Sequence, residues 1–152
     1  MPISEITELL DIAIDREIAS EAFYIGAQKK TQDPGARELL QELASQEAKH
    51  REWVKDLKEK GLSRQSWRRK KLPDLMISEY LIDINLEEPV GLQDVITAAM
   101  KREQNSIDFY TQMKQLLNVK IAQQLCERLI QEEHRHKSRL EVFYDDFFLK
   151  EN

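Results

Sequence analysis

The sequence predicts an all-α protein: a four-helix bundle of two similar helical hairpins, with a long connection between the second and third helices. Three observations predict this fold. Four long segments carry apolar residues spaced three and four positions apart, which marks one face of a helix. The second pair of segments repeats the first. Only 4 glycines and 4 prolines occur in 152 residues, which is too few turn-forming residues for an all-β sandwich.

The helices begin and end at recognisable signals. Ser4 is a suitable N-cap for the first helix, and Asp33-Pro34-Gly35 separates it from the second. Gly61 is a suitable stop for the second helix and Asn118 for the third. Short links within each pair predict two antiparallel hairpins, over about 4–60 and about 92–148.

The connection over 62–91 is the long segment between the hairpins. It contains Pro73 and Pro89, so it cannot be one continuous helix, although Leu75 to Leu81 has the length of a short one. One long middle connection lets the second hairpin cross over and pack beside the first, as in a ferritin-like bundle. We expect residues 1–152 to form this single domain.

A basic cluster with Trp67 lies in the connection, over residues 64–71. It is either a docking patch for an acidic protein or for nucleic acid or, as we favour, a solvated loop whose tryptophan packs on the bundle. The net charge of the whole chain is −5, which argues against a protein that coats nucleic acid or an anionic membrane. We therefore expect no nucleic acid as partner.

The rest of the composition points to a cytoplasmic protein. No apolar run approaches the roughly 20 residues of a membrane span, and the first residues lack a signal peptide. We therefore expect no membrane as partner. The single cysteine, Cys126, excludes an intrachain disulfide and a four-cysteine metal site, and we interpret it as a small core residue.

The two halves of the chain are related by a repeat of 86 residues. The window 13–24 is identical to 99–110 at 6 of 12 positions. The matches include polar residues inside the apolar stripes, which packing alone would not select. The matched pairs are Arg16 with Arg102, Glu17 with Glu103, Ser20 with Ser106, Tyr24 with Tyr110, Glu47 with Glu133, and His50 with His136.

The middle of each stripe is ionisable, and this predicts a metal centre. Each Glu-x-x-His motif, at Glu47 and at Glu133, places a carboxylate and an imidazole on one helix face. With Glu17 and Glu103 the core would hold four carboxylates and two imidazoles. Four unpaired buried carboxylates are costly, whereas two divalent ions cancel their charge. This donor set suits iron or manganese better than structural zinc and matches the dinuclear carboxylate sites of four-helix bundles.

At these residues the sequence resembles the rubrerythrin and ferritin-like di-iron family. The resemblance covers all four helices, through Glu17-x-x-Ser20-x-x-Phe23-Tyr24, its copy at Glu103, and the two Glu-x-x-His motifs. It implies two iron ions, with manganese or zinc as alternatives. It further implies that Glu47 and Glu133 bridge the metals, that Glu17 and His50 complete one metal and Glu103 and His136 the other, and that Tyr24 and Tyr110 hydrogen-bond near the centre.

The sequence departs from that family in two ways. It has no four-cysteine rubredoxin segment, so we expect electrons from a separate, rubredoxin-like donor. Ser106 stands where such proteins tend to carry a further carboxylate, which puts their redox movement of iron in doubt. Glu21 is a surface residue or an extra ligand, and we favour the surface. We interpret Glu132 and His134 as surface or outer residues.

Three classes of function remain open at this point. The leading hypothesis is a di-iron oxidoreductase that reduces hydrogen peroxide or dioxygen under oxidative stress, working as a homodimer. The second is a ferroxidase that handles iron. The third is a non-enzymic helical interaction module in which the metal only stabilises the bundle.

Overall fold

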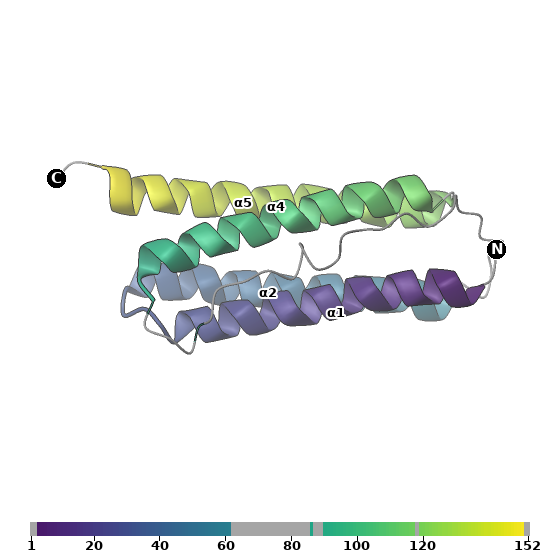
Figure 1. Ribbon diagram of the computed structural model, residues 1–152, viewed down its shortest axis with the longest axis horizontal. Helices are drawn as coiled ribbons and strands as arrows, with labels where there is room; N and C mark the ends of the chain where they lie inside the picture. The colour runs from purple at the N-terminus through teal and green to yellow at the C-terminus, as the bar shows by residue number, and fades with distance from the viewer. Residues whose placement is uncertain (1–2, 62–85, 87–89, 118, 151–152) are drawn as a thin grey trace.

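The computed structural model describes residues 3–61, 86, 90–117 and 119–150 and confirms the all-α four-helix bundle (Figure 1). Its long helices are α1 (Ile3–Gln28), α2 (Pro34–Asp56), α4 (Leu92–Leu116) and α5 (Lys120–Tyr144). A π-helical turn extends α2, η1 (Leu57–Gly61), and another extends α5, η2 (Asp145–Leu149). The predicted short helix at Leu75 to Leu81 and the basic cluster over 64–71 lie outside the described residues.

The helix ends follow local chemistry. α1 begins at Ile3, one residue before the predicted cap Ser4. The Asp33 side chain accepts a hydrogen bond from the Ala36 backbone N–H at 2.8 Å, and Pro34 occupies the first turn of α2. Gly61 lies within η1, so the helix continues as far as this residue. α4 ends at Leu116, and Asn118 lies outside the described residues.

The two hairpins lie against each other with all four helices nearly aligned (Figure 1). α1 packs along α2 and α4 along α5, while the hairpins meet where α2 faces α5 and α1 faces α4. The bundle therefore has two faces between its hairpins, the α1–α4 face and the α2–α5 face. No helix in the described ranges is long and apolar enough to cross a membrane.

The core consists of two apolar clusters separated by a polar layer. One cluster includes Ile6, Leu10, Val54, Met113 and Leu129, and the other includes Phe23, Leu40, Leu43, Ile96 and Leu140. The stripes predicted from the sequence are buried almost throughout. Leu92 and Phe143 are half-buried, and Phe147, the last residue of the fourth stripe, is 47% exposed, because it lies in η2, where the π-helical turn shifts the register beyond Tyr144.

Candidate metal centre

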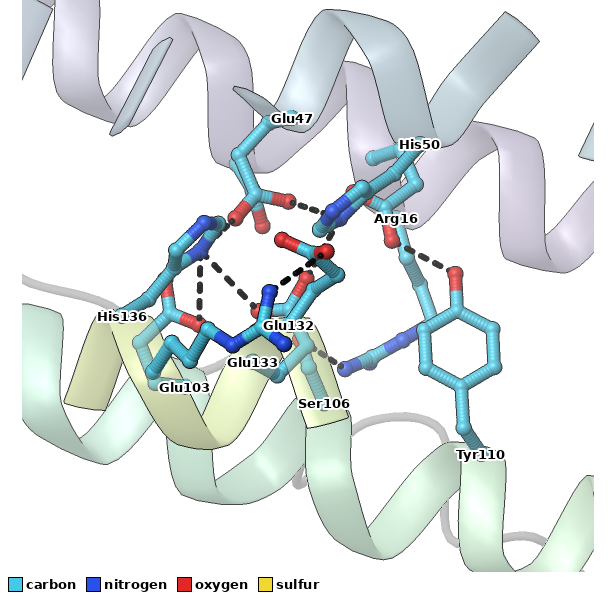
Figure 2. Close-up of polar contacts among 12 residues, drawn as sticks. Arg16, Glu47, His50, Glu103, Ser106, Tyr110, Glu132, Glu133 and His136 are labelled. Atoms are coloured by element: carbon cyan, nitrogen blue, oxygen red, sulfur yellow. Dashed lines mark hydrogen bonds and ion pairs between the residues drawn. The ribbon is translucent and has the colours of Figure 1, made fainter. Parts of the chain in front are cut away.

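The structure brings all six predicted ligand residues together in the middle of the bundle, and Figure 2 labels all of them except Glu17. No side chain among them is more than 3% exposed. α1 and α4 contribute one glutamate each, whereas α2 and α5 each contribute a glutamate and a histidine three residues later on the same helix face. The six are Glu17, Glu47, His50, Glu103, Glu133 and His136.

The donor atoms of these residues form two overlapping groups, each with atoms within 4.8 Å of one another. One group adds Glu17 and His50 to a shared pair, and the other adds Glu103 and His136. The shared pair is Glu47 and Glu133. Two neighbouring positions are thus each surrounded by three carboxylates and one imidazole.

Glu47 and Glu133 divide their oxygens between the two imidazoles. Glu47 places Oε2 3.6 Å from Nδ1 of His50 and Oε1 3.2 Å from Nδ1 of His136. Glu133 places Oε1 2.7 Å from Nδ1 of His50 and Oε2 3.8 Å from Nδ1 of His136. The imidazole rings stack with centroids 5.4 Å apart. Each carboxylate therefore spans both positions, as a bridging ligand must.

The outer carboxylates are oriented by tyrosines from the opposite hairpin. Tyr110 donates to Oε1 of Glu17 at 2.6 Å, and Tyr24 donates to Oε1 of Glu103 at 2.5 Å. Burial and the neighbouring carboxylates raise the pKa of both tyrosines well above the ordinary value of 10, so both remain neutral donors. Each bond leaves Oε2 of the glutamate directed toward the centre.

Burial and repulsion from neighbouring carboxylates favour the protonated form of the two shared residues, Glu47 and Glu133. Burial, together with the charges of Glu17 and Glu103, raises the pKa of Glu47 to about 8. Burial and the same neighbouring charges also raise the pKa of Glu133 well above its ordinary value. At neutral pH these two residues are therefore mostly uncharged in the metal-free protein.

The outer carboxylates behave in the opposite way. Burial raises the pKa of Glu17, but the neighbouring polar groups of Glu47 and His50 and the hydrogen bond from Tyr110 outweigh it and lower the pKa to about 2. Glu103 also has a lowered pKa, because its own hydrogen-bonding neighbours outweigh burial in the same manner. Both outer carboxylates are therefore ionised.

The imidazoles carry the compensating charge. Burial lowers their pKa, but the carboxylates around them outweigh it and raise the pKa of His50 to about 10 and that of His136 to about 9. Two imidazolium ions thus face two carboxylates and two neutral carboxyl groups. The metal-free centre reaches zero net charge by holding protons.

Several oxygen and nitrogen atoms of the centre that could bind a metal ion make no hydrogen bond within the described residues, although they are fully buried. Buried polar atoms are rarely left in this state, and each one needs an explanation. Carboxylate oxygens and imidazole nitrogens are the donors that divalent iron, manganese and zinc accept, so the residues fit a dinuclear metal site. The atoms are Oε2 of Glu17, Glu47 and Glu103, both oxygens of Glu133, both nitrogens of His50, and Nε2 of His136.

Two buried arginines flank the centre on the α1–α4 face. Arg16 reaches across to Oγ of Ser106 at 3.4 Å, and Arg102 reaches back to Oγ of Ser20 at 3.2 Å. Each guanidinium also lies over a phenylalanine ring of the opposite hairpin, with Arg16 4.5 Å from the centroid of Phe109. Sequence reasoning matched these arginines in the repeat but assigned them no role. Their place among the polar residues that the repeat shares between its two halves was the signal.

The remaining residues around the centre differ in their involvement. Glu21 accepts from Arg51 at 2.7 Å and belongs to neither inner group. His134 is exposed, and Cys126 is fully buried with a pKa raised by burial to about 12. Glu132 comes close to both imidazoles, in agreement with the second of the two alternatives, an outer residue of the centre rather than a surface residue.

Trp53 makes the two halves unequal. Its ring lies 5.2 Å from that of His50 and stacks under Arg128 at 3.8 Å. At the repeat-equivalent positions, Arg139 instead forms an ion pair with Glu42. Sequence reasoning did not identify this difference, because Trp53 stands outside the matched positions.

Comparison with known proteins assigns the family. The family model of rubrerythrin matches residues 8–144. The chain belongs to the rubrerythrin family. Its fold resembles that of a hypothetical protein from Pyrococcus furiosus, with 24% identity, a TM-score of 0.70, and coverage of 95% of this chain and 94% of the other.

A second solved structure has the same fold: a Thermotoga maritima protein assigned to the ferritin-like diiron-carboxylate class. It is 23% identical, with a TM-score of 0.69, and the match covers 94% of each chain. A comparison with curated protein sequences finds no significant match. The centre described above lies wholly within the residues that match the rubrerythrin model.

Metal binding to this centre should release about four protons per chain near pH 7. Two come from the imidazolium ions and two from the neutral carboxyl groups of Glu47 and Glu133, since the ions replace their charge. Calorimetric titration in buffers of different ionisation enthalpy measures this number. The variant Glu141→Gln, changed at an exposed position, should release the same number, and release of fewer than about two protons would contradict the charge assignment.

Raising the pH should destabilise the metal-free protein between about pH 7 and pH 10. In this range the folded state holds protons on Glu47, His136 and His50, with pKa values of about 8, 9 and 10. The unfolded chain has already released them, so the free energy of unfolding falls as the pH rises. Chemical denaturation across this range measures the effect. Metal-loaded protein is the control and should depend less on pH; a flat metal-free profile would refute the prediction.

Proposed function

We propose that this protein is a dinuclear iron oxidoreductase that reduces hydrogen peroxide with electrons from a separate donor protein. The observation that carries the proposal is the way Glu47 and Glu133 divide their oxygens between His50 and His136. Membership of the rubrerythrin family supports the same assignment. Carboxylate-rich sites favour iron or manganese over structural zinc, which prefers thiolates.

The residues divide into two terminal pairs and one bridging pair. Glu17 and His50 would hold one ion, and Glu103 and His136 would hold the other. Glu47 and Glu133 would each bind both ions. Two divalent ions would replace the protons of the metal-free state, so the centre would remain near zero net charge. The tyrosine hydrogen bonds would keep each outer carboxylate turned inward, leaving one oxygen free for a metal.

When bound, an iron pair supplies two electrons to a small oxidant, one from each metal. Reduction of hydrogen peroxide consumes these two electrons and two protons and yields two molecules of water. The protein's own contribution is enclosure and position: every ligand is buried, so bulk water and large reductants are excluded. Electrons therefore come through the protein from a donor at its surface.

Ferroxidase activity is the second candidate, and Ser106 favours it. This residue accepts from Arg16, where a further carboxylate would supply an additional ligand. Without that carboxylate, the α4 side of the centre offers no second acidic group to follow an iron ion as its oxidation state changes. A centre of this kind suits oxidation and release of iron as well as peroxide turnover.

Fully loaded protein should contain two metal ions per chain, about 3.5–4 Å apart as in other two-metal sites. Glu47→Ala should lower occupancy of both positions, because this carboxylate is placed to bridge, whereas Glu17→Ala should mainly weaken one. Elemental analysis and X-ray absorption measure both effects. Glu21→Ala is the matched control and should leave two ions bound. A single mononuclear ion in saturated wild-type protein would rule out the model.

Hydrogen peroxide should oxidise the diferrous protein faster than dioxygen does under the same conditions. Stopped-flow absorbance after mixing with each oxidant measures the two rates, and added reductant should then give repeated turnover with peroxide. If dioxygen is as fast as peroxide, the peroxidase assignment fails and ferroxidase becomes the better description. Iron uptake beyond two ions per chain would point the same way.

A further inference from the structure

A third group of metal-binding donors lies at the edge of the buried centre. His50, Glu132 and His136 each offer one donor atom, and these three atoms lie within 4.8 Å of one another (Figure 2). The two histidines are fully buried, and each has its Nε2 atom without a hydrogen bond in the described part of the chain. Glu132 differs from the six inner residues because its side chain is 20% exposed. This group thus extends from the buried histidines of the centre to a side chain that is in contact with solvent.

The two faces between the hairpins offer different ligands to an approaching cation. On the α1–α4 face the buried guanidinium groups of Arg16 and Arg102 lie beside the centre, and a guanidinium has no lone pair with which to bind a cation. On the α2–α5 face the corresponding level holds the Glu132 carboxylate and the imidazoles of His50 and His136, which can bind a cation once they release their protons. A divalent ion therefore has a favourable approach from the α2–α5 face.

We infer that His50, Glu132 and His136 form an outer loading site, through which divalent metal ions pass into the buried centre. The inference rests on the proposed metal-binding function. Imidazole and carboxylate donors suit iron, manganese or zinc in the divalent state. Glu132 forms an ion pair with Arg135 at 3.1 Å, but Arg135 is 69% exposed, and an arriving ion can displace so weak a surface pair.

Transfer inward requires few changes of ligand. His50 belongs to the outer loading site and to one inner group, and His136 belongs to the outer loading site and to the other inner group. An ion can therefore pass from one side of a shared imidazole to the other while it exchanges Glu132 for Glu133, the next residue on α5. Each inner position offers three carboxylates against one at the outer loading site, so an ion that displaces the protons of the centre gains carboxylate ligands as it moves inward.

Of the two positions related by the repeat, only the one in the second half provides a carboxylate for this route. The position equivalent to Glu132 in the first half is Gln46, a half-buried neutral residue that directly precedes Glu47. A carboxamide has no charge with which to attract a cation. The equivalence of these two positions suggests a double variant, Glu132→Gln with Gln46→Glu. It moves the carboxylate to the first half of the chain and keeps the net charge constant.

The test follows the rate at which the metal-free, full-length protein takes up Co²⁺, monitored by the Co²⁺ absorption in a stopped-flow instrument. Glu132→Gln should load about ten-fold more slowly or worse, at the lower end of the range over which charged clefts raise association rates. The final stoichiometry should remain two Co²⁺ per chain. Glu141→Gln is the matched control, because this exposed residue of α5 also pairs with a basic neighbour, Lys137, and it should load at the wild-type rate.

The double variant should recover most of the lost rate, and the rate of wild-type protein should fall more steeply with ionic strength than that of Glu132→Gln. Equal loading rates for Glu132→Gln and Glu141→Gln would overturn the inference. So would a lower final stoichiometry in Glu132→Gln, which would make Glu132 a resident ligand, or a double variant as slow as Glu132→Gln. Wild-type protein that never binds two Co²⁺ would instead refute the proposed function itself.

Discussion

The structure depends on neutralising four carboxylates that are buried in the core of a small helical bundle. An isolated buried charge costs several kcal/mol, so this layer is tolerable only if its charges cancel. In the metal-free protein, protons on Glu47, Glu133 and the two imidazoles meet this requirement. Two divalent ions would meet it equally well. Both states are compatible with one fold. Exchange between them couples metal binding to proton release and to the stability of the folded protein.

The same constraint organises the packing. The polar layer divides the apolar core into two clusters, so neither cluster runs the length of the bundle. Across the layer the hairpins are joined by reciprocal hydrogen bonds, from Tyr24 to Glu103 and from Tyr110 to Glu17. Each hairpin thus supplies a donor that the other requires. The arginine and serine pairs on the α1–α4 face follow the same reciprocal pattern.

The sequence predicted the fold and the composition of the centre because both are periodic. A stripe such as Ala13, Glu17 and Ser20 fixes a helix face, and the 86-residue repeat distinguishes polar residues with a role from chance ones. Glu132 could not be found in this way, because it lies one position from the stripe and has glutamine as its counterpart. The exposure of Phe147 depends on the π-helical turn η2, and local periodicity carries no signal for a change of register.

The contact between Trp53 and His50 has a practical consequence. Trp53 and Trp67 are the two tryptophans of the sequence, and Trp53 touches one imidazole of the centre, whereas Arg139 occupies the matching place in the other half. A paramagnetic ion beside His50 lies one ring away from the indole and can quench its fluorescence. In a Trp67→Phe background, emission would therefore respond more strongly to filling of the His50 half than to filling of the His136 half. The broken symmetry of the repeat thus gives the two metal positions different fluorescence responses.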